Sequence, residues 1–153
     1  MNSKILRCFF LVILFSIPSL CFSEPDSNIW EFLEENFYYN KTNVTKSSNI
    51  ISIWTYGVVT DNFRNARIEA VKKEDIEKSE AYKSFDHFLG LCEIDCGKKQ
   101  CRGTEFIDYD DQGNVLNHLK INNSEWEIIT PYSIFDTLYL KLCPTEKKQP
   151  QKN

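Results

Sequence analysis

Glycine and proline are scarce in this sequence of 153 residues, with five of each, and histidine occurs only twice. The scarcity of glycine and proline excludes collagen-like and low-complexity architectures, and the glycines form no loop that could cradle a phosphate. The two histidines, His87 and His118, stand in no spacing typical of a metal site, a haem attachment or a catalytic triad. We therefore predict a protein that is not an enzyme and holds no metal.

Long hydrophobic runs are also lacking, apart from one at the start of the chain that predicts a secretory signal peptide. Lys4 and Arg7 supply its positive start, Cys8 to Ile17 are mostly apolar, and Pro18 ends the run. A helix of about ten residues rises roughly 15 Å, which is half the thickness of the hydrocarbon core of a membrane. We expect residues 1–23 to be removed on export, with no membrane span left afterwards.

The chain has fewer basic than acidic residues, 18 against 22, and the predicted signal peptide contains two of the basic ones. Binding to nucleic-acid phosphates needs a clustered positive surface, so a nucleic-acid partner is disfavoured. Residues 146–153 carry charge, glutamine and proline but no apolar side chain, and we expect them to be a disordered tail. Residues 24–145 then form a single domain.

The hydrophobic pattern of this domain predicts an α+β fold. Ile50–Val59 is the strongest strand signal, and Asp110–Asn114 has the composition of a hairpin turn. A charged segment with apolar side chains on one side predicts a surface helix over about Ala66–Lys78. Ser133, with Asp136 three residues later, resembles the cap of a C-terminal helix packed on the sheet.

The remaining pattern predicts an antiparallel sheet of about five to seven strands in a meander. The polar segment Lys41–Ser48 has the composition of a turn. Besides Ile50–Val59, short runs rich in aromatic and β-branched residues predict strands at Ile29–Leu33, Phe37–Tyr39, Leu89–Cys96, Cys101–Asp108, Val115–Lys120 and Trp126–Ile129.

Four cysteines remain after the leader, Cys92, Cys96, Cys101 and Cys143, and export favours their pairing in two disulfides. Free thiols are the alternative, and a zinc site is disfavoured by the loose spacing. A simple hairpin turning at Lys98–Lys99 would place Cys96 opposite Cys101. Cys92 would then lie about 13 Å along the strand, beyond disulfide reach of Cys101, and would be left for Cys143.

The candidate binding residues are the basic side chains of the same predicted hairpin. Lys98, Lys99 and Arg102 lie at or near its tip, where positive charge on an acidic protein could attract an acidic partner. The alternative interpretation is that these side chains only keep the turn solvated.

Several short motifs follow one another from residue 30 to residue 143. They are Trp30, Tyr38-Tyr39-Asn40-Lys41, Ile53-Trp54-Thr55, Tyr82–His87, Leu91–Cys96, Tyr109–Val115, Trp126–Ser133 and Leu142-Cys143. In this order and with these gaps they resemble the surface-adhesin protein E family of Gram-negative bacteria. The sequence departs from the family pattern at Tyr132, where a small residue is expected before Ser133.

The resemblance implies a sheet with packed helices in a protein exported to the periplasm or the outer cell surface. It implies a protein partner among extracellular matrix or serum proteins, such as vitronectin and laminin, and it makes haem a possible ligand. It also implies a disulfide between Cys96 and Cys143, which leaves Cys92 to Cys101, and we favour this pairing. We predict an adhesin-like binding protein; the alternatives are a small-ligand carrier of the haem type and an inhibitor of a secreted enzyme.

Overall fold

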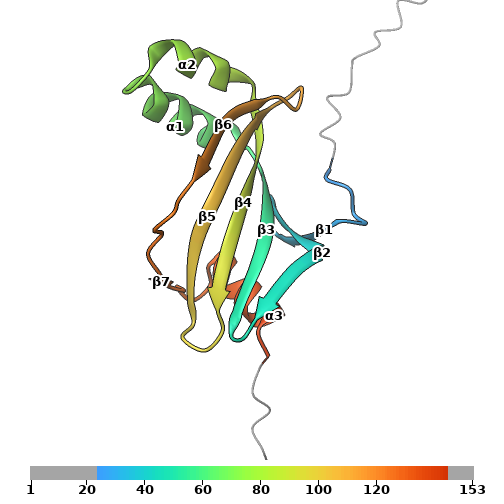
Figure 1. Cartoon of the computed structure of the whole chain (residues 1–153). Coiled ribbons are helices and arrows are strands. Elements are labelled where there is room, and N and C mark those ends of the chain that lie inside the picture. Colours follow the sequence, from blue (N-terminus) through green and yellow to red (C-terminus); the bar gives the residue numbers. More distant parts are fainter. Residues whose placement is uncertain (1–23, 145–153) are drawn as a thin grey trace, which may run out of the picture.

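The computed structural model describes residues 24–144, which form the predicted α+β fold: one antiparallel sheet with helices packed against it (Figure 1). Within this range the sheet has seven strands. The elements, in chain order, are β1 (Trp30–Glu34), β2 (Phe37–Ser47), β3 (Ile50–Val58), α1 (Asp61–Lys72), α2 (Ile76–Ala81), the 3-10 helix η1 (Tyr82–Ser84), β4 (Phe85–Asp95), β5 (Gln100–Asp110), β6 (Val115–Lys120), β7 (Glu127–Ile128) and α3 (Ile134–Leu142).

The sheet is a meander, as the sequence predicts. The strands lie in the order β1-β2-β3-β4-β5-β6, and the short β7 pairs with the start of β5. The predicted turn after β5 is held by Asp110, whose carboxylate accepts hydrogen bonds from the backbone of Gln112 and Asn114 at 3.0 and 2.7 Å. Asp110 thereby satisfies backbone donors that have no partner in the ladder.

One face of the sheet carries the core. Every second side chain of β3 is buried, among them Ile51 and Ile53, as period-two alternation requires. Figure 1 shows α3 near one end of the strands and α1 with α2 at the other. Leu138 of α3 is fully buried in one cluster with Ile53, and Tyr82 and Phe85 form a second cluster beside α1.

Three element predictions were wrong by more than two residues: β4 begins at Phe85 and not at Leu89, and the other two differ because of local turn and cap chemistry. The segment Lys41–Ser48 was predicted to be a turn, but β2 continues to Ser47. The side chain of Asn40 does form a local turn, because it accepts hydrogen bonds from the backbone of Thr42 and Asn43 at 3.0 and 2.9 Å. This turn makes a bulge in β2, after which the pairing with β3 resumes. The single helix predicted over Ala66–Lys78 is two helices, since Asp75 caps a new helix by accepting from Lys78 N at 2.9 Å.

The cysteines confirm one predicted disulfide and correct the other. Cys96 and Cys143 are bonded, with their Cα atoms 5.5 Å apart. Cys92 and Cys101, which were predicted to pair with each other, are both buried free thiols. In the register of β4 with β5, Cys92 lies opposite Gly103 and Cys101 opposite Ile94. The two cysteines are therefore diagonal neighbours, whose Cα atoms lie about 7 to 8 Å apart, beyond the reach of a disulfide.

The prediction of a simple hairpin turning at Lys98–Lys99 was also wrong. The four-residue turn spans 96–99 and not 97–100, so Cys96 leaves the ladder and Cys101 lies opposite Ile94. A shift of one residue in the turn is enough to release Cys96 for α3.

The signal peptide predicted at residues 1–23 and the tail predicted at 146–153 lie outside the described residues. No helix among residues 24–144 has the length and apolar composition needed to cross a membrane.

Candidate functional site

The turn between β4 and β5 presents Lys98 and Lys99, two of the predicted binding residues. Asp95, buried at the end of β4, shapes this turn by accepting hydrogen bonds from the backbone of Gly97 and Lys98 at 2.9 and 3.0 Å. Lys99 closes the turn in a left-handed conformation with φ of 54°. The position of the basic tip is therefore fixed by a buried carboxylate.

Two of the three predicted binding residues are engaged within the fold. Lys99 Nζ lies 2.8 Å from Asp136 Oδ1 and 5.2 Å from the centre of the Tyr139 ring. Arg102 pairs with Glu93, Nη2 to Oε2 at 2.6 Å, and its guanidinium lies 4.4 Å from the centre of the Trp126 ring. Lys98 is exposed and has no ion pair among the residues described. Only Lys98 thus presents its charge freely.

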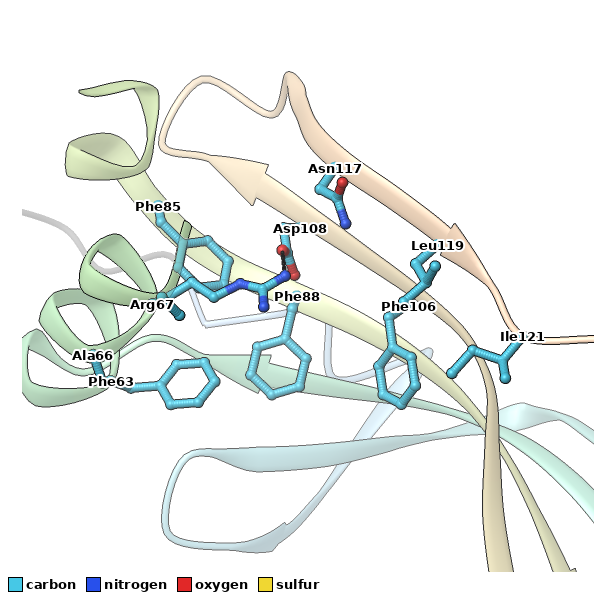
Figure 2. A pocket seen from close by; sticks show the side chains of 11 residues that line it. Phe63, Ala66, Arg67, Phe85, Phe88, Phe106, Asp108, Asn117, Leu119 and Ile121 are labelled. Carbon is cyan, nitrogen blue, oxygen red and sulfur yellow. Dashed lines mark hydrogen bonds and ion pairs between the residues drawn. The ribbon is translucent and has the colours of Figure 1, made fainter. Parts of the chain in front are cut away.

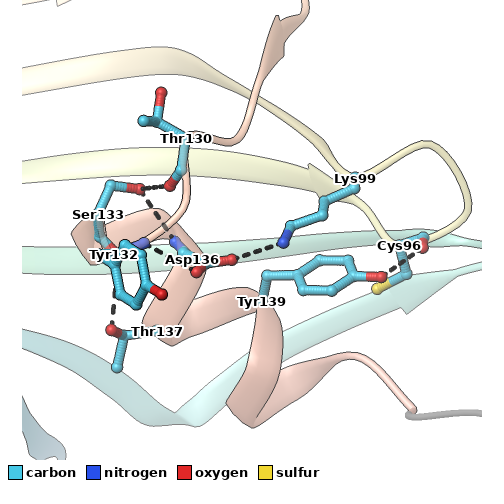
Figure 3. Close-up of polar contacts among 8 residues, drawn as sticks. All are labelled: Cys96, Lys99, Thr130, Tyr132, Ser133, Asp136, Thr137 and Tyr139. Carbon is cyan, nitrogen blue, oxygen red and sulfur yellow. Dashed lines mark hydrogen bonds and ion pairs between the residues drawn. The ribbon is translucent and has the colours of Figure 1, made fainter.

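Asp136 organises the loop that precedes α3 (Figure 3). Its Oδ2 accepts a hydrogen bond from Tyr132 N at 3.0 Å, and its backbone N–H donates to Ser133 Oγ at 3.2 Å. This is the predicted cap of the C-terminal helix. The hydrogen bond from Lys99, followed by that from the Tyr132 backbone, lowers the pKa of Asp136 below its ordinary value of 3.8. Asp136 is therefore a carboxylate at neutral pH.

Tyr132 is the most unusual residue of this region. Its φ is 64°, a left-handed conformation that is a genuine outlier for a bulky side chain, and 98% of its surface is exposed. Backbone strain of this kind costs on the order of 1 to 3 kcal/mol and persists only where the surrounding structure imposes it. Here Asp136 imposes it through the hydrogen bond to Tyr132 N. The ring therefore points into solvent from a fixed backbone.

A second exposed apolar side chain lies close to the same turn. Ile128 in β7 is 78% exposed and lies opposite Gln100, two residues after Lys98. We call the set Lys98, Ile128 and Tyr132 the hairpin-end surface. These exposed side chains lie on three segments that contact one another, the turn between β4 and β5, β7 and the loop before α3, and the aromatic Tyr132 belongs to a residue type that is enriched in protein interfaces.

Several crosslinks make the support of this surface rigid. The disulfide ties Cys96 in the turn to Cys143 at the end of α3. Tyr139 OH donates to Cys96 O at 3.3 Å (Figure 3). Ile129 N donates to Lys99 O at 3.1 Å. The turn, β7 and α3 are therefore held together by covalent, ionic and hydrogen bonds.

The histidines have stacking and hydrogen-bond partners and do not share a site. His87 is stacked between Tyr56 and Tyr109, with ring centroids 4.9 Å apart on both sides. His118 Nε2 lies 2.6 Å from Glu105 Oε1 on β5. Among residues 24–144 there is no group of three or more His, Cys, Asp or Glu side chains that could hold a metal ion.

Comparison with known protein families gives a match to the surface-adhesin protein E family over residues 30–144. The chain belongs to this family. The matched residues include the sheet, all three α-helices and the hairpin-end surface. No curated protein is significantly similar to the chain in sequence.

Solved structures of protein E show the same fold. A crystal structure of protein E from non-typeable Haemophilus influenzae has a TM-score of 0.52 and 12% identity, and the match covers 79% of this chain and 78% of that one. A selenomethionine form of Haemophilus influenzae protein E has a TM-score of 0.51 and 9% identity, covering 78% and 88%. At such low identity the likeness shows the fold alone.

Sequence reasoning named Lys98 but missed Ile128 and Tyr132. The one signal for Tyr132 was its departure from the family pattern, a bulky residue directly before the capping Ser133. The left-handed backbone of Tyr132 and the exposure of Ile128 are consequences of tertiary contacts, and no local pattern in the sequence encodes them.

Proposed function

We propose that this protein is exported and binds a protein of the host extracellular matrix or serum through the hairpin-end surface of Lys98, Ile128 and Tyr132. Membership of an adhesin family supports an adhesin-like surface protein as the general role. The choice of surface rests on one observation. Tyr132 is 98% exposed, and one carboxylate oxygen of Asp136 holds its backbone in a strained conformation. The other oxygen of Asp136 pairs with Lys99 and so stabilises the fold.

The physical argument concerns the entropy of binding. An exposed aromatic side chain on a fixed backbone has few torsions to immobilise, so little conformational entropy is lost when it enters a pocket of a partner. Tyrosine is also enriched among residues that dominate interface energetics. Lys98 adds a positive charge that increases the association rate with an acidic partner.

The experiment measures binding of the mature chain, residues 24–153, to immobilised vitronectin and laminin by biolayer interferometry. Tyr132→Ala is expected to raise Kd at least about tenfold, which corresponds to 1.4 kcal/mol of binding free energy. Ile76→Ala is the matched control, because Ile76 is also exposed, at 69%, but lies on α2 at the other end of the sheet. It is expected to change Kd less than about twofold, as energetically neutral positions do.

Two results would contradict the proposal. Absence of binding to any matrix or serum protein would remove the proposed partner class. Equal affinities for the wild-type protein and Tyr132→Ala would show that attachment uses another surface.

A further inference from the structure

A hollow of about 420 Å³ lies between α1 and the face of the sheet that carries the core (Figure 2). Phe88 in β4 and Phe106 in β5 form its floor, and Phe63 of α1 and Leu119 of β6 stand on opposite sides. Figure 2 shows Phe63, Phe88, Phe106 and Ile121 following one another along it. Its volume lies within the range of about 300 to 1,000 Å³ that is typical of small-molecule sites.

Glycines set the depth of this hollow. A Cβ atom on Gly57 would lie 2.3 Å from the ring of Phe88, and one on Gly103 would lie 2.4 Å from the ring of Phe106. Both rings therefore lie against bare backbone, and any larger residue beneath them would push them into the hollow. Gly90, which pairs with Phe106 across the ladder, lies on the same face. Three of the five glycines of the chain thus lie on this face of the sheet.

The rim leaves apolar surface in contact with water. Phe63 is 48% exposed and Leu119 is 49% exposed, although both line the hollow. Burial of apolar surface is favourable by about 25 cal/mol per Å², so an apolar ligand placed between these side chains would be stabilised. The hollow is therefore energetically suited to a hydrocarbon.

A buried carboxylate marks a polar site in the hollow. Asp108 is 6% exposed, and its Oδ2 accepts hydrogen bonds from Arg67 Nη2 at 2.9 Å and from Tyr82 OH at 2.7 Å. Burial, together with the bond to Asp108, raises the pKa of Tyr82 to about 12, so its hydroxyl stays a donor. Lys78 Nζ donates to Asn117, which also lines the hollow, at 2.9 Å.

The polar site offers hydrogen-bond donors to an anion. Arg67 and Asp108 are the two charged side chains that line the hollow, and Lys78 lies beside it through its hydrogen bond to Asn117. Arg67 donates to Asp108 through Nη2 alone. The other N–H groups of its guanidinium can therefore donate to a ligand. A planar guanidinium can pair with a second carboxylate at its free edge.

We propose that the hollow binds a free fatty acid, a ligand with one linear hydrocarbon chain and one carboxylate. The chain lies along the rings of Phe88 and Phe106, and the carboxylate accepts hydrogen bonds from the free edge of Arg67. Haem is not the ligand that these residues favour, because no described lining residue is a histidine, cysteine or methionine that could coordinate its iron. This inference does not depend on the proposed attachment to host proteins.

The test is isothermal titration calorimetry of the mature chain, freed of lipid under conditions that keep it folded, with dodecanoate below its micellar concentration. Dodecylammonium is the matched probe of equal chain length and opposite charge. Dodecanoate is expected to bind at least tenfold more tightly than dodecylammonium, because the free N–H groups of Arg67 can donate to a carboxylate and have no lone pair to accept from an ammonium group. Equal affinities would overturn the assignment of the carboxylate to Arg67.

A blocking variant and a matched control locate the site. Ala70 lines the hollow from the exposed side of α1, so Ala70→Trp fills it without entering the core. Asn65→Trp places the same side chain on α1 at an exposed position outside the lining. Ala70→Trp is expected to weaken dodecanoate binding at least tenfold, and Asn65→Trp less than twofold, with unchanged circular dichroism for both.

Two results would overturn the proposal, and both are distinct from failure of the proposed function. Absence of dodecanoate binding to the wild-type protein, or equal weakening by the two tryptophan variants, would show that the hollow is not a fatty-acid site. Loss of attachment to host proteins in Ala70→Trp, without any binding of dodecanoate, would identify a protein as the occupant. Loss of host attachment in Tyr132→Ala alone concerns the hairpin-end surface and leaves the fatty-acid site in place.

Discussion

Lys99 Nζ lies 2.8 Å from Asp136 Oδ1, and this ion pair joins the turn between β4 and β5 to the first turn of α3. The same carboxylate accepts the hydrogen bond from Tyr132 N through its other oxygen. Asp136 therefore couples two functions of one region: it stabilises the packing of the helix on the hairpin, and it holds the exposed Tyr132 in place. Loss of its charge should affect both.

The first prediction concerns Asp136→Asn. The pKa of Asp136 is lowered in the folded state, so its ionisation stabilises the fold above the ordinary value of 3.8, and this stability is lost as the pH falls through the lower folded pKa. Asp136→Asn should therefore lower the melting temperature at pH 7, and the difference from the wild-type protein should shrink towards about pH 2. Circular dichroism melts across this pH range measure it. A difference that stays constant with pH would contradict the role of the charge.

The second prediction concerns the disulfide between Cys96 and Cys143. It closes a loop with a sequence separation of 47 residues. Its loss through the double substitution Cys96→Ser and Cys143→Ser should lower the free energy of unfolding by about 2 to 4 kcal/mol. Urea unfolding followed by fluorescence measures this change, and wild-type protein in reductant is the control. If reductant left the unfolding midpoint of the wild-type protein unchanged, the disulfide would not contribute to stability.

The third prediction concerns the thiols of Cys92 and Cys101. Burial raises the pKa of Cys92 to about 12 and also raises that of Cys101, so neither forms a thiolate readily in the folded protein. Iodoacetamide at pH 8 should leave both unmodified in the native state. In urea without reductant, mass spectrometry should find these two cysteines alkylated. If they remained unmodified in urea but reacted after reduction, a disulfide would join them, as the sequence had suggested.

Hydrophobic patterning was sufficient to predict the order of the strands, whereas the pairing of Cys96 with Cys143 was predicted from the family resemblance, against the simple hairpin that the local sequence suggested. The sequence did not reveal that Cys101 lies opposite Ile94, since that register depends on where a four-residue turn begins. The hollow was not predictable either. It needs Gly57 and Gly103, from different strands, to lie beneath the rings of Phe88 and Phe106, and such contacts are set by the three-dimensional fold.

The binding candidates were likewise predicted only in part from the sequence. Lys98, Lys99 and Arg102 were predicted as one basic group because they are close in the sequence. The structure separates them, because Asp136 engages Lys99 and Glu93 engages Arg102. These partners lie on other elements, so a pattern of local charges could not reveal them.

The last prediction separates the backbone strain at Tyr132 from the contribution of its ring. Tyr132→Ala and Tyr132→Gly both remove the ring, but only glycine adopts a φ of 64° without a steric cost. Because the ring is 98% exposed, its removal costs little packing energy. The free energy of unfolding should therefore be higher for Tyr132→Gly than for Tyr132→Ala by up to about 1 kcal/mol, after the greater chain entropy of unfolded glycine is included. Urea unfolding of the two variants measures the difference.

The two variants should behave alike in binding, because neither presents an aromatic side chain to a partner. If Tyr132→Gly is more stable but binds host proteins as weakly as Tyr132→Ala, the strain at this position serves the presentation of the ring and not the stability of the fold. A glycine variant that is less stable than the alanine variant would show that the loop before α3 relaxes to a right-handed conformation, and that Asp136 does not fix the backbone of Tyr132.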